Sequence, residues 1–273
     1  MFPDLPSFQE ITRMNLQTDD IIQTFDPVDL SETIKKAALL DRSDTKYVIP
    51  ASRLNEVLEA CKPMYRILEI RNKRSFQYDT VYFDTPGLRF YHEHHAGKQN
   101  RQKVRIRKYL DSGMAYLEVK HRLNKGNTIK SRMVLDAQSP EDISALKQPV
   151  FADAGNLPVD QLRPVIKISY DRITLVDLTN EERVTIDRHI VFERGNETRS
   201  MDGIVIAEVK QNKKHPSFFR RQMRTMNIRE GSVSKYCLGT LLMNGQVKRN
   251  RFKTRLNRIL KITDALKQTI SHA

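Results

Sequence analysis

Residues 101–109 read Arg-Gln-Lys-Val-Arg-Ile-Arg-Lys-Tyr, and the fold prediction starts from the alternation of these side chains. Residues two apart on a β-strand point to the same face of the sheet. Lys103, Arg105 and Arg107 therefore project to one side, and Val104 and Ile106 project to the other. This pattern predicts a strand with an apolar back and a positive front.

The same design recurs in the neighbouring segments. Alternating charged and apolar residues predict further strands at 114–122, 128–135, 182–192 and 203–210, whose charged sides carry Glu118, Lys120, Arg122, Lys130, Arg132, Arg183, Asp187, Glu208 and Lys210. A half-exposed sheet whose polar face meets water also alternates. Such a face has no need to be so consistently cationic, because neighbouring cations repel one another unless an anion neutralises them. We therefore infer that the positive sides enclose an anion.

The remaining segments complete an α+β prediction. Further strands are expected at 45–49, 65–70, 76–84 and 165–176, and helices at 51–61, 140–147, 216–227, 232–243 and 249–269. Apolar backs covered by helices leave the charged fronts pointing inward when such a sheet closes. The predicted fold is a closed antiparallel β-barrel, or tunnel, with peripheral helices. Each Arg can fork onto two phosphate oxygens, so the positive interior suits a chain of phosphates.

Composition agrees with an anionic partner. The 273 residues include 47 Lys and Arg against 33 Asp and Glu, a formal net charge of +14. Nucleic acid, an anionic membrane and a phosphate-rich small molecule are candidate partners, and a merely solvated surplus of charge stays an alternative. Cys61 and Cys237 are isolated, which excludes a disulfide framework and a cysteine metal site. Without a signal peptide or a long apolar run, a cytoplasmic location is expected.

Eight short segments, taken in order, resemble a known family. They are Lys46-Tyr47, Tyr82-Phe83-Asp84-Thr85, residues 101–109, residues 117–120 (LEVK), Lys130-Ser131-Arg132, Tyr170-Asp171-Arg172, residues 207–210 (AEVK) and Ser234-Lys235-Tyr236. Together they resemble the vacuolar transporter chaperone (VTC) domain, the polyphosphate polymerase branch of the triphosphate tunnel enzymes, in a stand-alone microbial form. The resemblance covers residues 38–242. It leaves a polar leader at 1–37, partly ordered at best, and a basic amphipathic helix at 243–273.

The resemblance implies a function as well as a fold. A β-tunnel would bind ATP or another triphosphate with Mn²⁺ or Mg²⁺ and pass the γ-phosphate to a growing polyphosphate chain. The residues expected to act on the phosphates are Arg105, Arg107, Lys120, Lys130, Arg132 and Lys210. Further binding residues are expected to be Lys46, Arg101, Tyr170, Arg172 and Lys235, and Glu208 is expected to hold the metal. A membrane-protein partner is a further candidate, with association at a membrane through it, and nucleic acid is the least favoured partner.

Other functions stay open at this point. The wider tunnel superfamily begins with Glu-x-Glu-x-Lys, where this chain has Arg42-x-Asp44-x-Lys46. The loss of the first carboxylate argues against a dedicated triphosphatase, for which Asp187 and Glu118 would be the candidate bases. A module that binds polyphosphate or an inositol phosphate without turnover is the other alternative. The basic strands show no regular aromatic platforms of the kind that bind single-stranded nucleic acid.

Two features outside this set have plain interpretations. His92 and His94 would share a strand face at a spacing that suits a metal, but no third ligand accompanies them, so a polar loop is favoured. The stretch 247–270 is basic and amphipathic, which allows membrane-surface binding. Packing against the barrel is the favoured reading of that helix.

Overall fold

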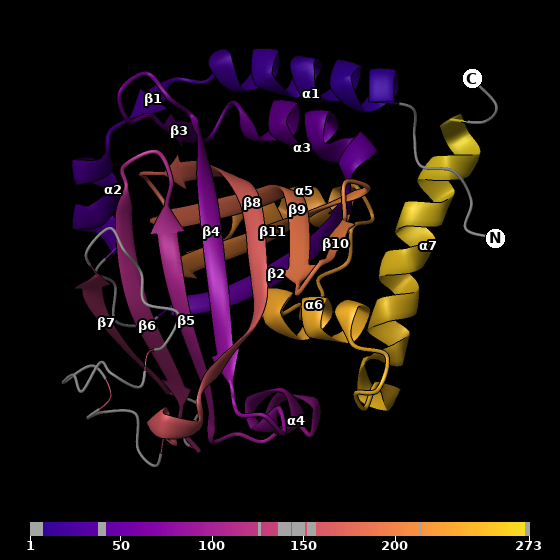
Figure 1. Cartoon of the computed structure of the whole chain (residues 1–273). Coiled ribbons are helices and arrows are strands. Elements are labelled where there is room, and N and C mark those ends of the chain that lie inside the picture. The colour runs from indigo at the N-terminus through magenta and orange to yellow at the C-terminus, as the bar shows by residue number, and fades with distance from the viewer. Residues whose placement is uncertain are drawn as a thin grey trace.

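The computed structural model of the chain describes residues 8–37, 42–124, 127–135, 143, 151, 157–212 and 215–270. In these ranges the strands form one 11-stranded sheet surrounded by helices (Figure 1). The strands are β1 (Pro27–Val28), β2 (Arg42–Pro50), β3 (Arg66–Leu68), β4 (Ser75–Asp84), β5 (Arg101–Tyr109), β6 (Met114–Arg122), β7 (Thr128–Leu135), β8 (Arg163–Asp177), β9 (Glu182–Arg194), β10 (Glu197–Ser200) and β11 (Ile204–Asn212). The helices are α1 (Phe8–Gln23), α2 (Leu30–Ala37), α3 (Leu54–Cys61), α4 (Arg89–His95), α5 (Phe218–Thr225), α6 (Lys235–Met243) and α7 (Lys253–Ile270).

The main ladder of the sheet is antiparallel and runs in the order β2-β11-β9-β8-β4-β5-β6-β7. The short strands β3 and β10 pair with β8 and β9, and β1 runs parallel to β3. Among the described residues no backbone pairing joins β2 to β7, so the predicted closure of the barrel is wrong. Alternation along a strand predicts which side chains share a face, whereas closure depends on strand number and stagger.

The open sheet is nevertheless curled, and its two ends face each other. Figure 1 shows β2 and β11 passing behind β4, β5 and β6. Lys120 on β6 lies within electrostatic reach of Glu208 on β11 and Asp44 on β2. Lys103 on β5 lies within reach of Lys46 on β2. The positive fronts predicted from the sequence therefore line the inner side of the curl.

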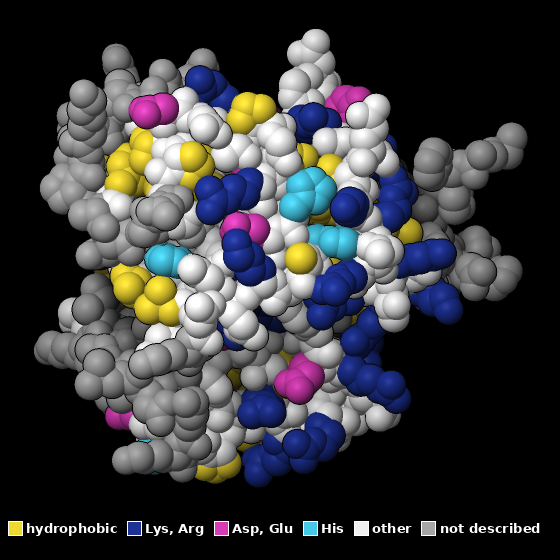
Figure 2. All heavy atoms as spheres, turned by 90° about the horizontal axis from the view of Figure 1, so that it is seen from below, with side chains coloured by type: hydrophobic (Ala, Val, Ile, Leu, Met, Phe, Trp, Pro, Cys, Tyr) yellow, Lys and Arg dark blue, Asp and Glu magenta, His cyan; other side chains and the backbone are white. Residues whose placement is uncertain are grey.

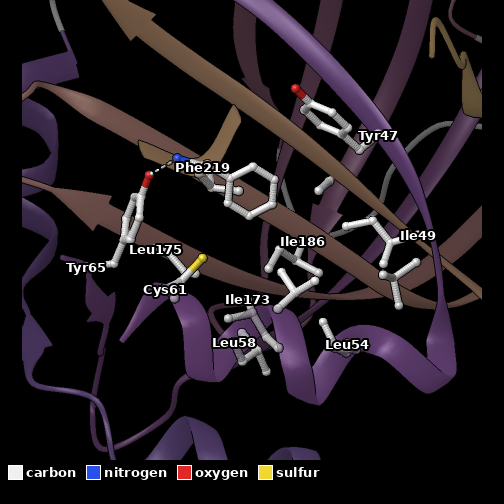
Figure 3. Packing of buried hydrophobic residues seen from close by; sticks show 14 of the residues in the cluster. Tyr47, Ile49, Leu54, Leu58, Cys61, Tyr65, Ile173, Leu175, Ile186 and Phe219 are labelled. Carbon is white, nitrogen blue, oxygen red and sulfur yellow. Dashed lines mark hydrogen bonds between the residues drawn. The ribbon is translucent and has the colours of Figure 1, made fainter. Parts of the chain in front are cut away.

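Helices cover the outer side of the sheet at two places. Figure 3 shows Leu54 and Leu58 of α3 packing with Ile173, Ile186 and Phe219 over β8 and β9. A second outer cluster packs behind β4, β5 and β6; it includes Phe83, Phe90, Val104, Ile106, Leu117 and Val119. Full burial of one such side chain contributes about 1.5–3 kcal/mol. The apolar backs of the strands thus hold the curl from outside.

Helix α6 packs on the inner side of the curl. Its Tyr236 ring stacks on Tyr82 of β4, with 5.2 Å between ring centroids. The Tyr236 hydroxyl donates to Asp84, a buried carboxylate that also accepts from the backbone N–H groups of Phe90 and Tyr91 at 2.9 Å each. Asp84 thereby joins the end of β4, the start of α4 and α6. The first turn of α6 is fixed beside the charged side chains.

Residues 8–37 are more ordered than the sequence suggested. In α1, the hydroxyl of Thr18 donates to Asn55 Oδ1 on α3 at 2.7 Å. Ile22 and Phe25 are buried in the outer cluster with α3. The backbone N–H of Ile67 donates to the carbonyl of Asp26 at 2.9 Å, which continues the contact into β1 and β3. A few apolar residues in a polar segment are enough to dock it, and the composition of the segment as a whole conceals them.

Most predicted elements agree with the structure to within a few residues at their ends. The predicted helix at 140–147 lies outside the described residues except for position 143, which is buried. The C-terminal helix packs as favoured, since Phe252 and Ile259 are buried in the cluster around α6. His92 and His94 lie on α4, so the expected strand, and the polar loop favoured in its place, are both wrong. In the described part of the chain, no helix is both long enough and apolar enough to cross a bilayer.

The close approach of α6 to the sheet makes Gly239 a test of this packing. A Cβ atom at Gly239 would lie 2.5 Å from Phe192 Cδ1 and 2.6 Å from Ile166 Cδ1. We expect Gly239→Ala to lower the free energy of unfolding by about 1–3 kcal/mol through overpacking, despite the better helix propensity of Ala. Thermal unfolding followed by circular dichroism measures this. Gly87→Ala is the control, because the space around Gly87 is open; an unchanged Tm for Gly239→Ala would contradict the packing.

Candidate functional site

Side chains cross the inner side of β5, β6 and β7 in registered rows. In one row Lys103 on β5 stands opposite Lys120 on β6, which stands opposite Lys130 on β7. Like charges directly opposite each other destabilise a sheet. No acid stands in register with the row, although Glu118 of the next row contacts Lys130. The remaining repulsion favours the binding of an anion.

The next row contains the acid that restrains these strands. Glu118 stands between Arg105 and Arg132. Its carboxylate lies 2.6 Å from Arg105 Nη2, 2.6 Å from Lys130 Nζ and 3.9 Å from Arg107 Nη1. Burial opposes its ionisation, but the three cations hold the pKa of Glu118 well below its usual value. Glu118 is therefore a fixed negative charge that orients its neighbours.

The facing wall, formed by β2, β8, β9 and β11, repeats the arrangement. Glu208 pairs with Lys46 across the strands and lies 3.4 Å from Lys210 Nζ. Burial opposes ionisation here too, and Lys46 and Lys210 still hold the pKa of Glu208 well below its usual value. Glu208 thus neutralises part of the charge of both Lys46 and Lys210.

A second acid of this wall joins the sheet to α6. Arg172 donates to both carboxylate oxygens of Asp187, at 2.6 and 2.9 Å, and Lys235 at the start of α6 pairs with the same group. Burial raises the pKa of Asp187, but Arg172 and Lys235 outweigh it and bring the pKa down to about 2. Asp187 therefore carries its charge throughout the neutral range.

We call these inner side chains the basic face. Its cations are Lys46, Lys103, Arg105, Arg107, Lys120, Lys130, Arg132, Arg172, Lys210 and Lys235, and its acids are Asp44, Glu118, Asp187 and Glu208. Lys120, Lys130 and Arg132 are exposed, so a ligand can reach them. Figure 2 shows that Lys and Arg also outnumber Asp and Glu on the surface seen from below. The surplus of cations favours an extended anion.

Tyr170 was predicted as a ligand, but the tyrosines beside it on the basic face, Tyr78, Tyr82 and Tyr116, were not. Tyr78 and Tyr170 stack in parallel with their centroids 5.3 Å apart, and the Arg172 guanidinium lies 5.0 and 5.3 Å from the two rings. Arg132 lies 5.0 Å from the ring of Tyr116. Such contacts orient planar guanidinium groups while leaving their N–H donors available. The signal was present, because Tyr78 and Tyr82 follow the same two-residue period as the arginines.

Tyr82 reports the strength of the positive field. Its hydroxyl accepts from Arg105 Nη1 at 3.0 Å. Burial raises the pKa of Tyr82, but Arg105, Arg107 and Lys103 outweigh burial and lower the pKa to about 8. A phenol that ionises so easily indicates a potential that favours negative charge.

The structure brings together most of the residues predicted as ligands. The basic face contains Arg105, Arg107, Lys120, Lys130, Arg132, Lys210, Lys46, Arg172, Lys235 and Glu208, and Tyr170 lies among them. Arg101 stands apart at the start of β5, where it faces Arg122 and donates to the carbonyl of Lys98 at 2.7 Å. Lys103 was not among the predicted ligands, although its Nζ donates to Ser234 at 2.9 Å beside α6. The functional roles of all these residues stay predictions.

The described residues offer no ready-made metal cage. In those ranges no three His, Cys, Asp or Glu side chains cluster in a way that could hold an ion. His94 on α4 is surrounded by cations; burial, Lys103 and Arg101 lower its pKa to about 3. Glu208 can supply one carboxylate, and Mg²⁺ is commonly bound through one or two carboxylates together with substrate phosphates. The donor set thus fits a metal that arrives with a phosphate chain.

Comparison with known proteins gives a family match and distant structural similarity. A family model described as the VTC domain matches residues 41–244. No curated protein matches the chain in sequence.

Among solved structures, HpAC1 from Hippeastrum, a candidate adenylyl cyclase with a dominant triphosphatase activity, aligns at 14% identity and a TM-score of 0.49, covering 77% of this chain and 98% of that one. A candidate adenylate cyclase from Bacillus halodurans aligns at 11% identity and a TM-score of 0.46, covering 71% and 96%. PH1012 from Pyrococcus horikoshii OT3 aligns at 13% identity and a TM-score of 0.40, covering 71% and 95%. At these scores the structural matches carry no conclusion about function.

The shifted phenol gives a first test of the basic face. Because cations stabilise its phenolate, Tyr82 should ionise near pH 8, well below its ordinary value of 10. A polyanion that neutralises those cations should raise the pKa of Tyr82 again. Titration of the phenolate absorbance near 295 nm, with and without tripolyphosphate, measures the shift, and Tyr82→Phe identifies the signal. A titration that tripolyphosphate leaves unmoved would argue against binding beside Arg105.

The lysine row gives a second test, in which stability and binding move in opposite directions. We expect Lys120→Met to raise the free energy of unfolding of the free protein by about 0.5 kcal/mol. Burial disfavours the charge of Lys120 and Lys103 repels it, and the loss of these two effects outweighs the lost attraction to Glu208 and Asp44. The same change should weaken tripolyphosphate binding about tenfold, through the loss of a charge-assisted hydrogen bond. Lys108→Met, on the opposite side of β5, should leave binding unchanged. Calorimetry measures both quantities, and equal affinities for the two variants would contradict this assignment.

Proposed function

This chain belongs to the VTC domain family, and we propose that it moves the γ-phosphate of ATP onto a growing polyphosphate chain with the help of a divalent metal ion. The observation that carries the proposal is the row of Lys103, Lys120 and Lys130 facing the charged wall of β2 and β11. A phosphate chain supplies a negative charge at each link. An extended polyanion therefore relieves repulsion along the whole row, as a single small anion could not.

Phosphoryl transfer depends on charge neutralisation and in-line placement more than on covalent help from the protein. The transferring group would lie among Arg105, Arg107, Lys120, Lys130, Arg132 and Lys210. Their preorganised donors stabilise charge on the equatorial oxygens. Lys46, Arg172 and Lys235, beside Tyr170, would hold the rest of the triphosphate. Arg101, at the α4 end of β5, would contact a longer chain as it leaves.

The metal fits as part of the substrate complex. Glu208 is the carboxylate that would hold it, because its lowered pKa keeps it ionised and the basic face surrounds it. Asp44, which lies in register with Lys210, is a second carboxylate nearby. When bound, Mn²⁺ or Mg²⁺ neutralises charge on the phosphate oxygens and on the leaving diphosphate. Lys46 and Lys210 would then turn from Glu208 to the phosphates.

Transfer to a phosphate acceptor suits this site better than hydrolysis. A terminal oxygen of the polyphosphate forms the bond to the γ-phosphorus, and the bond from that phosphorus to the bridging oxygen of the leaving ADP breaks. This acceptor is already an anion and needs no general base. Glu118 and Asp187, the candidate bases for a hydrolase, are each held by at least two cations. Their lowered pKa values make them poor proton acceptors at neutral pH.

A polyphosphate-binding module without turnover is the second candidate function. The observation in its favour is that both Lys46 and Lys210 contact Glu208, so the carboxylate is engaged before any metal arrives. Such a module would bind the chain and release no diphosphate. The proposed partners in either case are a triphosphate and polyphosphate, and a membrane-protein partner that would bring the chain to a membrane stays a proposal.

Phosphorus NMR of purified protein with ATP and Mn²⁺ tests the proposal. We expect the signal of internal polyphosphate groups to grow together with that of ADP. Arg105→Ala and Glu208→Gln should each reduce the rate by about 100-fold or more, the loss typical of one preorganised electrostatic group. The matched control Glu197→Gln changes an exposed acid on β10 and should keep the wild-type rate.

The products separate the alternatives. Free orthophosphate or pyrophosphate as the only product would replace the polymerase with a triphosphatase. Binding of tripolyphosphate with no diphosphate release at any Mn²⁺ or Mg²⁺ concentration would establish the binding module instead.

A further inference from the structure

A cavity lies on the outer side of the sheet. It has a volume of about 570 Å³ and opens between the start of α5, the end of β11 and the turn between β8 and β9. Volumes of roughly 300–1,000 Å³ are usual for small-molecule sites. Gln211 lines this cavity, while the preceding residue Lys210 belongs to the basic face. Because successive residues of a strand point to opposite faces, the cavity is separate from the basic face.

The charge of the cavity comes from three arginines of α5. Arg220, Arg221 and Arg224 line it, and none of the described residues that line it is Asp or Glu. Arg220 is 3.9 Å from Glu230, a loose pair between partly exposed groups. In the described part of the chain, no acid pairs with Arg221 or Arg224. This arrangement favours a ligand with a compact, strongly anionic group such as a phosphate.

The Gln211 amide beside the cavity has an acceptor atom that lacks a hydrogen-bond donor. Gln211 is only 6% exposed, and its Nε2 donates to the carbonyl of His215 at 3.1 Å. Its Oε1 is buried without a hydrogen-bond partner. A buried acceptor left unpaired costs about 1–3 kcal/mol. A ligand hydroxyl or amino group can satisfy this acceptor once the Gln211 side chain turns it toward the cavity.

One wall of the cavity is flat and apolar. Phe218 and Met64 line it, and the Arg221 guanidinium lies 4.9 Å from the centroid of the Phe218 ring. Planar rings stack on aromatic side chains and on guanidinium groups. The position of Phe218 is fixed by the cap of α5, where Ser217 Oγ accepts from the backbone N–H of Arg220 at 2.9 Å. The wall is therefore built into the fold.

We propose that this cavity binds a nucleoside phosphate. The phosphate would meet Arg220 and Arg224, the base would lie against Arg221 and Phe218, and a base amino group or ribose hydroxyl would donate to Gln211 Oε1. Binding in this cavity requires no reaction on the basic face. This proposal can therefore be tested independently of the proposed transferase activity. Since β11 carries both Lys210 and Gln211, a ligand here would also contact the strand that holds Glu208.

Binding of ADP to a chain with a disabled basic face tests the proposal. In the Arg105→Ala/Lys120→Ala background, calorimetry should show one ADP site. Arg224→Glu should weaken it about tenfold, the loss expected for a charge-assisted hydrogen bond. Gln211→Leu should weaken it about fivefold, in line with one hydrogen bond. Arg199→Glu, a charge reversal at an exposed position on β10, is the control and should change nothing.

Competition identifies the ligand class. Orthophosphate and tripolyphosphate should displace ADP only weakly, because neither carries a base to pack against Phe218 and Arg221. Competition by either as strong as by ADP itself would reduce the cavity to a general anion site and overturn the proposal. So would displacement by an acidic peptide at the same concentrations, or an affinity for ADP that Arg224→Glu leaves within twofold. Arg224 is exposed on α5, so this variant should fold even if Gln211→Leu does not.

Discussion

Electrostatic repulsion among the cations of one sheet face governs how this protein is built. Lys103, Lys120 and Lys130 stand directly opposite one another on three strands, and the wall that carries Lys46 and Lys210 curls round to face them. A sheet designed only for stability would intersperse acids or neutral residues here. The fold instead concentrates positive charge and compensates elsewhere.

The compensation has three identifiable parts. Buried acids with strongly lowered pKa values each tie two or more cations together, as Glu118 and Asp187 do. Tyrosine rings support the guanidinium planes of Arg132 and Arg172. The outer apolar clusters and helices supply the burial that holds the strands in place. Each device leaves N–H donors of the basic face available for a ligand, which links the stability of the fold to its proposed chemistry.

The sequence correctly predicted which side chains line the inner side of the curl. It did not predict correctly whether the sheet closes or that the N-terminal segment packs against it. The two-residue period of Lys103, Arg105 and Arg107 is a local property, and it fixed their common side correctly. Closure of the barrel was wrong among the described strands, because the meeting of β2 with β7 depends on stagger accumulated over the whole sheet. The ordered N-terminal segment was missed because its contacts depend on Ile22 and Phe25 within a polar stretch.

The composition of the site was only partly predictable. Matching short segments in order identified the family, and most of the expected ligands gather on one face. Tyr78 and Tyr116 could have been predicted from their two-residue period along the strands. They were missed because the ligands were chosen mainly by charge. The cavity beside α5 could not have been predicted, because Met64, Gln211 and Arg224 come together only through tertiary packing.

The two facing walls of the basic face should hold one phosphate chain between them. A crystal structure of the protein with tripolyphosphate would show whether they do. We expect phosphate oxygens within hydrogen-bond distance of Arg105 and Lys120 on one wall and of Lys46 or Lys210 on the other. Tripolyphosphate found only on the outer surface, with the lysine row still facing solvent, would contradict it.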